Sequence, residues 1–275
     1  MAKRIGIVFN EGRQDAVILE GELGDRLRQR GEQVLTIPWQ VEEIPPIDLL
    51  IVLGGDGTFL RGANLVSRYG TPILGVNLGT LGFLAETASE EAYHAVEAFF
   101  AGELEIEERV MLDVTLFRGG QMAARQIALN DGVISKGSSS RLVSYSLFVD
   151  AVHVSSYSAD GVIVATPTGS TAYALSAGGP ILAPDVPGFT IVPVCPHSLT
   201  ARPLVVSDRS TVKVSMSNCY DGAVLSVDGR KGIPLLLGDE ILLSRSAHLT
   251  HLIKYSRGFF DKLRTKLHWG GKPVG

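Results

Sequence analysis

Apolar runs and helical spacings alternate over the first hundred residues of this 275-residue chain. Short apolar runs bounded by turn residues are typical of buried strands, and apolar residues three and four positions apart are typical of helices. We expect strands at residues 5–9, 34–37, 48–53 and 72–76, and helices at residues 16–30, 58–69 and 89–101. This strand–helix alternation predicts a parallel sheet with right-handed crossovers, that is, an N-terminal Rossmann-like α/β domain over residues 1–102.

The pattern changes after Gly102, where strand-like stretches follow one another with few helical spacings. Gly119-Gly120 separates two such stretches and predicts a β-hairpin. We expect further strands at residues 142–156, 162–165, 191–194, 211–217, 224–227 and 240–244. The predicted fold is therefore α/β plus β, with a C-terminal mostly-β, sandwich-like domain over residues 103–252.

The last segment, residues 253–275, returns to a helical pattern. Phe260, Leu263 and Leu267 lie at helical spacing, and their shared face needs an apolar partner. We expect this tail to pack on the first domain.

Composition and charge narrow the class of protein. Hydrophobic residues make up 45% of the chain and charged residues 20%, so we expect a folded protein with a large core. A net charge of −4 disfavours a nucleic-acid-binding protein, and we expect no membrane partner, because the apolar runs are shorter than a spanning helix. Cys195 and Cys219 have no metal-ligand spacing, which favours a reduced, cytoplasmic protein, and we expect Cys195 to be buried.

The most informative motif is Gly54-Gly55-Asp56-Gly57-Thr58, which directly follows the apolar run at residues 49–53. Glycines allow sharp turns and the close approach of a ligand, and ligands of open α/β sheets bind at the carboxyl ends of strands. Thr58 is the expected N-cap of the following helix, whose free N–H groups suit a phosphate. No Walker A sequence occurs, and no GxGxxG follows the first strand, so a P-loop enzyme and an ordinary dehydrogenase are disfavoured.

Two later clusters carry further polar groups. Asn130-Asp131-Gly132 follows an apolar stretch and by itself is typical of a turn. A β-branched strand after Asp160 runs into Thr166-Pro167-Thr168-Gly169-Ser170-Thr171, a hydroxyl-rich loop before a predicted helix. Such a loop is a candidate for anion binding.

Taken together, these motifs resemble the three signatures of the NAD kinase family, in the same order and over nearly the whole chain. The segment at residues 193–203 is also similar to that family. Lipid kinases and phosphofructokinases carry loops like residues 54–58, and the stretch at residues 160–180 separates this chain from them. The resemblance implies ATP-dependent phosphorylation of the 2′-hydroxyl of the adenosine ribose of NAD, a divalent metal cation such as Mg²⁺ on the ATP phosphates, and a cytoplasmic homo-oligomer, either dimer or tetramer.

The resemblance also implies roles for individual residues. Asp56 would be the general base, Gly57 would lie beside NAD, and Asn130 and Asp131 would hold the adenosine ribose. Other positions that match the family's nucleotide site are Arg61, Arg141, Ser158, Asp160, Thr171, Ala172, Tyr173, Ala174, Leu175, Ser176 and Arg230. No protein-built metal site is expected.

Three positions depart from the family pattern: Asp131, where the family commonly has Glu; Ser158, where it often has a basic residue; and Arg230, where it often has an uncharged amide. The change at Ser158 leads to the hypothesis of an altered preference between NAD and NADH. The sequence leaves open whether polyphosphate replaces ATP. Two rival functions are a lipid or sugar kinase with a similar loop, and a non-catalytic dinucleotide sensor.

Overall fold

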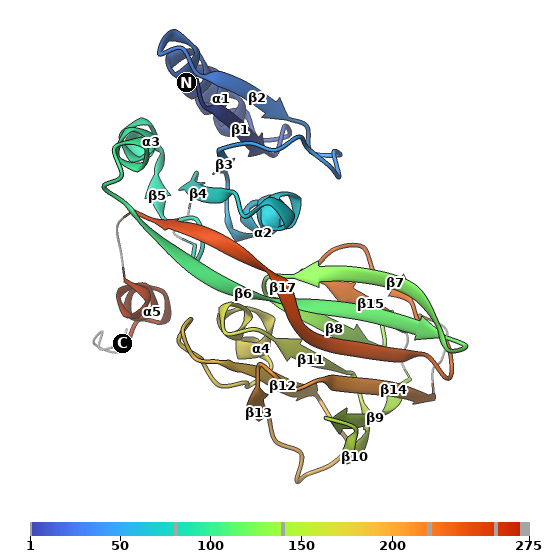
Figure 1. The fold of residues 1–275 in the computed structure, drawn as a ribbon. Helices are drawn as coiled ribbons and strands as arrows, with labels where there is room; N and C mark the ends of the chain where they lie inside the picture. Colours follow the sequence, from blue (N-terminus) through green and yellow to red (C-terminus); the bar gives the residue numbers. More distant parts are fainter. Residues whose placement is uncertain (1, 80–81, 139–140, 219–221, 256–257, 270–275) are drawn as a thin grey trace. The chain divides into compact units, whose positions relative to one another are not determined.

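The computed structural model describes residues 2–79, 82–138, 141–218, 222–255 and 258–269 (Figure 1). The chain forms two compact units, one of residues 1–109 with 248–275 and the other of residues 110–247. We call these unit 1 and unit 2. The long strands β6 (Glu105–Arg118) and β17 (Glu240–Lys254) each run across a boundary, so the boundaries fall inside strands, whereas the sequence prediction had placed them after residues 102 and 252.

Unit 1 contains the predicted parallel sheet, in the order β2-β1-β3-β4. Strand β3 is buried along its whole length, as expected for the central run of apolar residues. Alternate side chains of β1, β3 and β4, which share one face of the sheet, form an apolar core with α1 and α3. The elements are β1 (Arg4–Phe9), α1 (Gln14–Gln29), β2 (Gln33–Ile37), β3 (Leu49–Leu53), α2 (Asp56–Val66), η1 (Ser67–Tyr69), β4 (Pro72–Asn77), β5 (Thr87–Ala88), η2 (Ser89–Glu91), α3 (Ala92–Phe100) and α5 (Phe259–Leu267).

Unit 2 is mostly β, and two sheets supply its core. One sheet is antiparallel in the order β13-β12-β11-β8-β15-β16, and strands β10, β9, β14 and β17 pair in the other. Apolar residues of both sheets meet in one cluster, which agrees with the predicted sandwich. The elements are β7 (Gln121–Ala128), β8 (Asp131–Ser135), β9 (Val143–Val149), β10 (Val152–Ala159), β11 (Gly161–Ala165), η3 (Thr168–Thr171), α4 (Tyr173–Ser176), β12 (Gly188–Val194), β13 (Leu204–Ser207), β14 (Val212–Asn218), β15 (Val224–Val227) and β16 (Ile233–Pro234).

Two hairpins show what local sequence does and does not reveal. The β6–β7 turn is at Gly119-Gly120, as predicted, with φ values of 57° and 78°. The stretch at residues 142–156, predicted as one strand, is instead the hairpin of β9 and β10. Asp150 and Ala151 form its turn with φ values of 50° and 65°, a conformation that glycine normally supplies.

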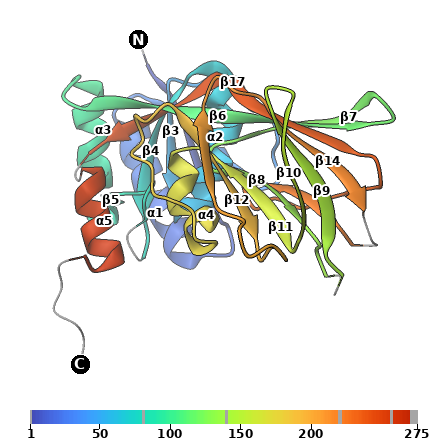
Figure 2. The ribbon, with the colours of Figure 1, turned by 90° about the horizontal axis from the view of Figure 1, so that it is seen from below.

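Three other expectations were wrong in detail. Helix α2 begins at Asp56 with Gly55 as its N-cap, so Thr58 is not the cap. Helix α5, coloured red in Figure 2, forms in unit 1 as expected, but Phe260 is 66% exposed, while Lys262 and Leu263 are buried. Cys195 is exposed rather than buried, because it follows the end of β12 in a turn with a φ of 45°.

Candidate active site

The loop after β3 is shaped by its glycines. Gly54 has a φ of 155°, and its N–H donates to the Val76 carbonyl on the neighbouring strand at 2.8 Å. A Cβ at Gly54 would lie 2.5 Å from Thr58 Oγ1, so a side chain does not fit there. The chain then enters α2 at once, which places Asp56 in the first helical turn, where the helix dipole favours a negative charge.

The Asp56 carboxylate accepts three consecutive backbone N–H groups from residues 83–85. Phe83 N–H donates to Oδ2 at 2.9 Å, while Leu84 and Ala85 N–H donate to Oδ1 at 2.9 and 3.3 Å. A carboxylate has about four acceptor positions, so, counting the donors among the described residues, one position on Oδ2 remains. The side chain is therefore fixed in orientation, is only partly buried, and retains one acceptor position.

Gly82 completes this arrangement, because a Cβ at that position would lie 2.1 Å from Asp56 Oδ1. The absence of a side chain lets the backbone at residues 82–85 wrap closely around the carboxylate. Residues 82–85 carry no polar side chains and act through their backbone N–H groups. For this reason the sequence interpretation did not single them out.

The other predicted residues of unit 1 are Gly57 and Arg61. Gly57 is exposed, and a Cβ there would meet no atom within 4 Å. The Arg61 guanidinium donates to the Val41 carbonyl at 2.6 Å and lies over the Trp39 ring, 5.0 Å from its centroid. Burial lowers the pKa of Arg61. A position of Arg61 near the phosphates of a bound nucleotide stays a prediction.

In unit 2, Asp228 organises the turn at Asn130-Asp131. Its carboxylate accepts Leu129 N–H on Oδ2 at 2.8 Å, and Asn130 and Asp131 N–H on Oδ1 at 2.8 and 3.2 Å. Asp228 itself has a φ of 50°, and its N–H donates to the Asp131 carbonyl at 3.0 Å. The sequence interpretation did not assign a role to Asp228. The Asp228-Gly229 pair before Arg230, which is typical of a turn, was the signal that could have identified it.

Burial dominates the electrostatics of this turn. It raises the pKa of Asp131 to about 7, and the neighbouring Asp228 carboxylate adds to that increase. Burial also raises the pKa of Asp228, while the three N–H groups and Arg230 oppose the increase. The two carboxyl groups form a coupled acidic pair, one of whose protons is released near neutral pH.

The hydroxyl-rich loop is joined to the same turn. Thr166 N–H donates to the Asn130 carbonyl at 2.9 Å, and the Thr166 hydroxyl donates to the Leu129 carbonyl at 2.5 Å. A Cβ at Gly169 would lie 2.1 Å from the Asn130 carbonyl oxygen. The structure thus brings together the second and third sequence clusters, at residues 129–131 and 166–171.

Three hydroxyl groups of this loop donate to backbone carbonyls. Ser170 and Thr171 donate to the carbonyls of Pro167 and Thr168 at 2.6 and 3.1 Å, as Thr166 does to Leu129. Their protons are therefore engaged within the protein. The following helix α4 has four residues, in which Ala174 is buried and Tyr173 is 49% exposed.

Comparison with known proteins decides the family. Family models of the ATP-NAD kinase N-terminal domain and C-terminal domain match residues 40–104 and 129–255. The chain is 44% identical to the NAD kinase of Desulforamulus reducens over 96% of this chain and 88% of that protein. It is 40% identical to the NAD kinase of Syntrophotalea carbinolica over 98% of this chain and 99% of that protein.

This chain belongs to the NAD kinase family. It is accordingly a phosphotransferase. Its fold is similar to that of yeast NADH kinase complexed with NADH, with a TM-score of 0.84 and 27% identity over 98% of this chain and 89% of that chain. It is also similar to that of an NAD kinase from Archaeoglobus fulgidus in complex with ATP, with a TM-score of 0.78 and 27% identity over 96% of this chain and 98% of that chain.

The remaining residues that match the NAD kinase nucleotide site all lie in unit 2. Asp160 forms an ion pair with Lys136 at 2.8 Å, and Ser158 shares a hydrogen bond with Ser144 at 2.9 Å. Arg230 donates to the Ile127 and Val227 carbonyls at 2.6 and 3.1 Å, which ties the ends of β7 and β15 together. Arg141 is exposed. Residues 171, 172 and 175 are partly buried, and Ser176 is exposed.

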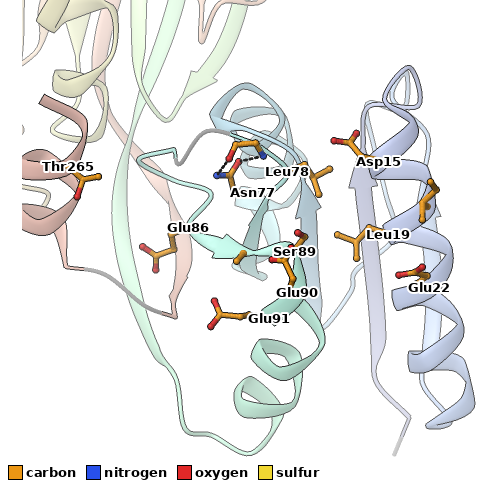
Figure 3. A pocket seen from close by; sticks show the side chains of 13 residues that line it. Asp15, Leu19, Glu22, Asn77, Leu78, Glu86, Ser89, Glu90, Glu91 and Thr265 are labelled. Atoms are coloured by element: carbon orange, nitrogen blue, oxygen red, sulfur yellow. Dashed lines mark hydrogen bonds between the residues drawn. The ribbon is translucent and has the colours of Figure 1, made fainter. Parts of the chain in front are cut away.

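A separate cavity of about 890 Å³ lies in unit 1 between α1 and the segment that leads into α3. Figure 3 shows Asp15 and Glu22 of α1 on one side and Glu90 and Glu91 on the other. Carboxylates on both sides repel phosphate groups, so this cavity does not fit the polyphosphate of a nucleotide. No helix in the part of the chain that the structure describes has the length and apolar character needed to cross a membrane.

Proposed function

We propose that this protein transfers the γ-phosphoryl group of ATP to the 2′-hydroxyl of the adenosine ribose of NAD, giving NADP, with Asp56 as the general base. Membership of the NAD kinase family supports phosphorylation of NAD. The observation that carries the role of Asp56 is its geometry: a carboxylate fixed by three N–H groups, with one acceptor position left on Oδ2.

The proposed step needs one proton acceptor. The ribose 2′-hydroxyl donates a hydrogen bond to Asp56 Oδ2, and its oxygen attacks the γ-phosphorus. The new O–P bond forms as the bond to the ADP oxygen breaks; the proton passes to Asp56, and ADP leaves. A positioned base contributes about 10²–10⁴-fold, and positioning with charge stabilisation supplies much of the rest.

We assign the binding of NAD to unit 2. Asn130 and Asp131 are fixed by Asp228, and Asp160 and residues 171–176 match the family's NAD positions. Because the pKa of Asp131 is about 7, its carboxyl group both accepts and donates hydrogen bonds near neutral pH. Two ribose hydroxyls fit such a group, since each of them also donates and accepts.

A divalent cation, in this proposal Mg²⁺, reaches the site on the ATP phosphates. Among the described residues there is no group of three or more His, Cys, Asp and Glu side chains that could hold a metal ion. We assign no protein ligand to it. The family resemblance supports a homo-oligomer, and the resemblance and the cysteine content support a cytoplasmic location; both are part of the proposal.

The experiment is an assay of NADP formation by the purified protein with NAD, ATP and MgCl₂. We expect NADP with ATP, and parallel reactions with polyphosphate or NADH define the donor and acceptor preferences. Absence of NADP would contradict the proposal and favour a lipid or sugar kinase. NAD binding without turnover would favour a dinucleotide sensor.

A further inference from the structure

The C-terminal helix of unit 1 is attached to the same backbone segment that holds Asp56. Lys262 on α5 is 4% exposed and forms an ion pair with Glu86, which is 6% exposed. The Lys262 ammonium also donates to the Phe83 carbonyl at 3.0 Å. The Glu86 carboxylate accepts Tyr255 N–H at 3.0 Å, so two points of the C-terminal segment meet residues 83–86.

One peptide group connects Lys262 with Asp56. The Phe83 carbonyl and the Leu84 N–H belong to the same planar peptide unit. Its oxygen accepts from Lys262 at 3.0 Å, while its N–H donates to Asp56 Oδ1 at 2.9 Å. A cation on the carbonyl polarises the peptide and strengthens its N–H as a donor. The planar unit also transmits any displacement at one end to the other.

A second contact holds the same residue from the side. The Lys266 ammonium lies over the Phe83 ring, 4.5 Å from its centroid. Lys262 and Lys266 are one helical turn apart on α5, so the helix contacts both the carbonyl and the ring of Phe83. A buried ammonium is expensive to desolvate, and apolar packing alone would have been satisfied by leucine at position 262.

We propose that Lys262 is a positioning residue for phosphoryl transfer: through the peptide unit between Phe83 and Leu84, it fixes the orientation of the Asp56 carboxylate. The inference rests on the proposed role of Asp56 as general base. It assigns to the C-terminal helix a part in the reaction, although Lys262 itself touches neither substrate nor the reacting atoms.

The test is a mutant cycle with Asp56→Asn. Lys262→Met alone leaves the Glu86 charge buried without its partner, so the main variant is Lys262→Met with Glu86→Gln. We expect kcat to fall about 10- to 100-fold with the KM for NAD within about twofold of the parent. In the Asp56→Asn background the same pair of substitutions should change the residual kcat by less than about twofold, because the group being positioned is already disabled.

Two further variants keep the result interpretable. Lys262→Arg retains a cation and a donor, and we expect its kcat within about threefold of the parent. Lys254→Met with Glu105→Gln removes an exposed ion pair of the same unit, joined at 3.0 Å, and should leave kcat unchanged within about twofold.

The inference is overturned if the Lys262→Met/Glu86→Gln protein keeps its kcat, or loses as much in the Asp56→Asn background as in the parent. It is also overturned if only stability changes, which thermal unfolding of each variant measures. A parent-like kcat for Asp56→Asn alone would instead reject the base itself, so the two failures are distinguishable.

Discussion

Asp56 in unit 1 and Asp228 in unit 2 bind the backbone in the same way. Each carboxylate accepts three consecutive N–H groups, one on one oxygen and two on the other, at distances of 2.8–3.3 Å. The two sites differ in what surrounds the carboxyl group. Burial raises the pKa of Asp228, which lies beside the acidic Asp131. Asp56 stands in the first turn of α2, where the helix dipole favours its negative charge.

The same hydrogen-bond pattern therefore serves two different purposes in the two units. At Asp228 the carboxylate shapes the backbone, because it fixes the turn that carries Asn130 and Asp131. At Asp56 the relation is reversed, since the backbone of residues 83–85 fixes the carboxylate. We infer that Asp228 acts on architecture and Asp56 on chemistry. The following predictions separate the two.

The largest effect is expected from Gly82→Ala. The new Cβ would lie 2.1 Å from Asp56 Oδ1, and the carboxylate must leave its three N–H donors to avoid it. We predict a fall in kcat of about 10²-fold, because a displacement of about 1 Å has this effect on a catalytic group. Steady-state kinetics measure it. Gly21→Ala, where a Cβ meets nothing within 4 Å, is the matched control. A normal kcat in Gly82→Ala would show that the three N–H bonds do not matter for catalysis.

A smaller effect, on stability, is expected from Gly169→Ala. Its Cβ would lie 2.1 Å from the Asn130 carbonyl oxygen and 2.6 Å from the carbonyl carbon, and this backbone is held by Asp228. We predict a loss of about 2 kcal/mol in unfolding free energy, typical of overpacking, together with weaker NAD binding. Urea unfolding and calorimetric titration with NAD check the two parts. An unchanged unfolding free energy would mean that this turn is not held rigidly.

The smallest effect concerns the pH dependence of stability at Asp131. Its pKa is about 7 in the folded protein and ordinary in the unfolded chain. Between these values the unfolded chain releases the proton first, so stability falls as pH rises, by at most about 1.4 kcal/mol per pH unit. Asp131→Asn removes this titration, so we predict that between pH 6 and pH 8 the parent loses about 1.4 kcal/mol of unfolding free energy that the variant keeps. Urea unfolding at both pH values measures it; parallel pH profiles for the two proteins would contradict the raised pKa.

Much of the fold was predictable because its signals are local. The buried run at residues 49–53 and the Gly119-Gly120 turn identify their elements by composition alone. The β9–β10 hairpin was missed because Asp150 and Ala151 adopt positive φ without being glycine. The helix start was misplaced from Asp56 to Thr58, because Gly55 caps α2 through its backbone rather than through a side chain.

The candidate site was predictable to the extent that it consists of side chains in motifs. Asp56, Asn130 and Asp131 stood out by residue type and by the resemblance. Gly82 and its neighbours did not, because they contribute backbone N–H groups to a residue far away in sequence. Lys262 was hidden for a different reason: a lysine in a helix is usually solvated, and its partner Glu86 is distant along the chain. The roles that the family resemblance implies for individual binding residues stay predictions.

The most direct test compares Asp56→Asn with Asp228→Asn by measuring kcat at saturating NAD, the Kd for NAD and the unfolding free energy of each. The account predicts that Asp56→Asn lowers kcat by at least about 10²-fold and leaves the Kd for NAD near that of the parent. It predicts that Asp228→Asn weakens NAD binding and stability but keeps kcat within about tenfold. A parent-like kcat for Asp56→Asn, or an equal loss of kcat in a folded Asp228→Asn protein, would contradict it.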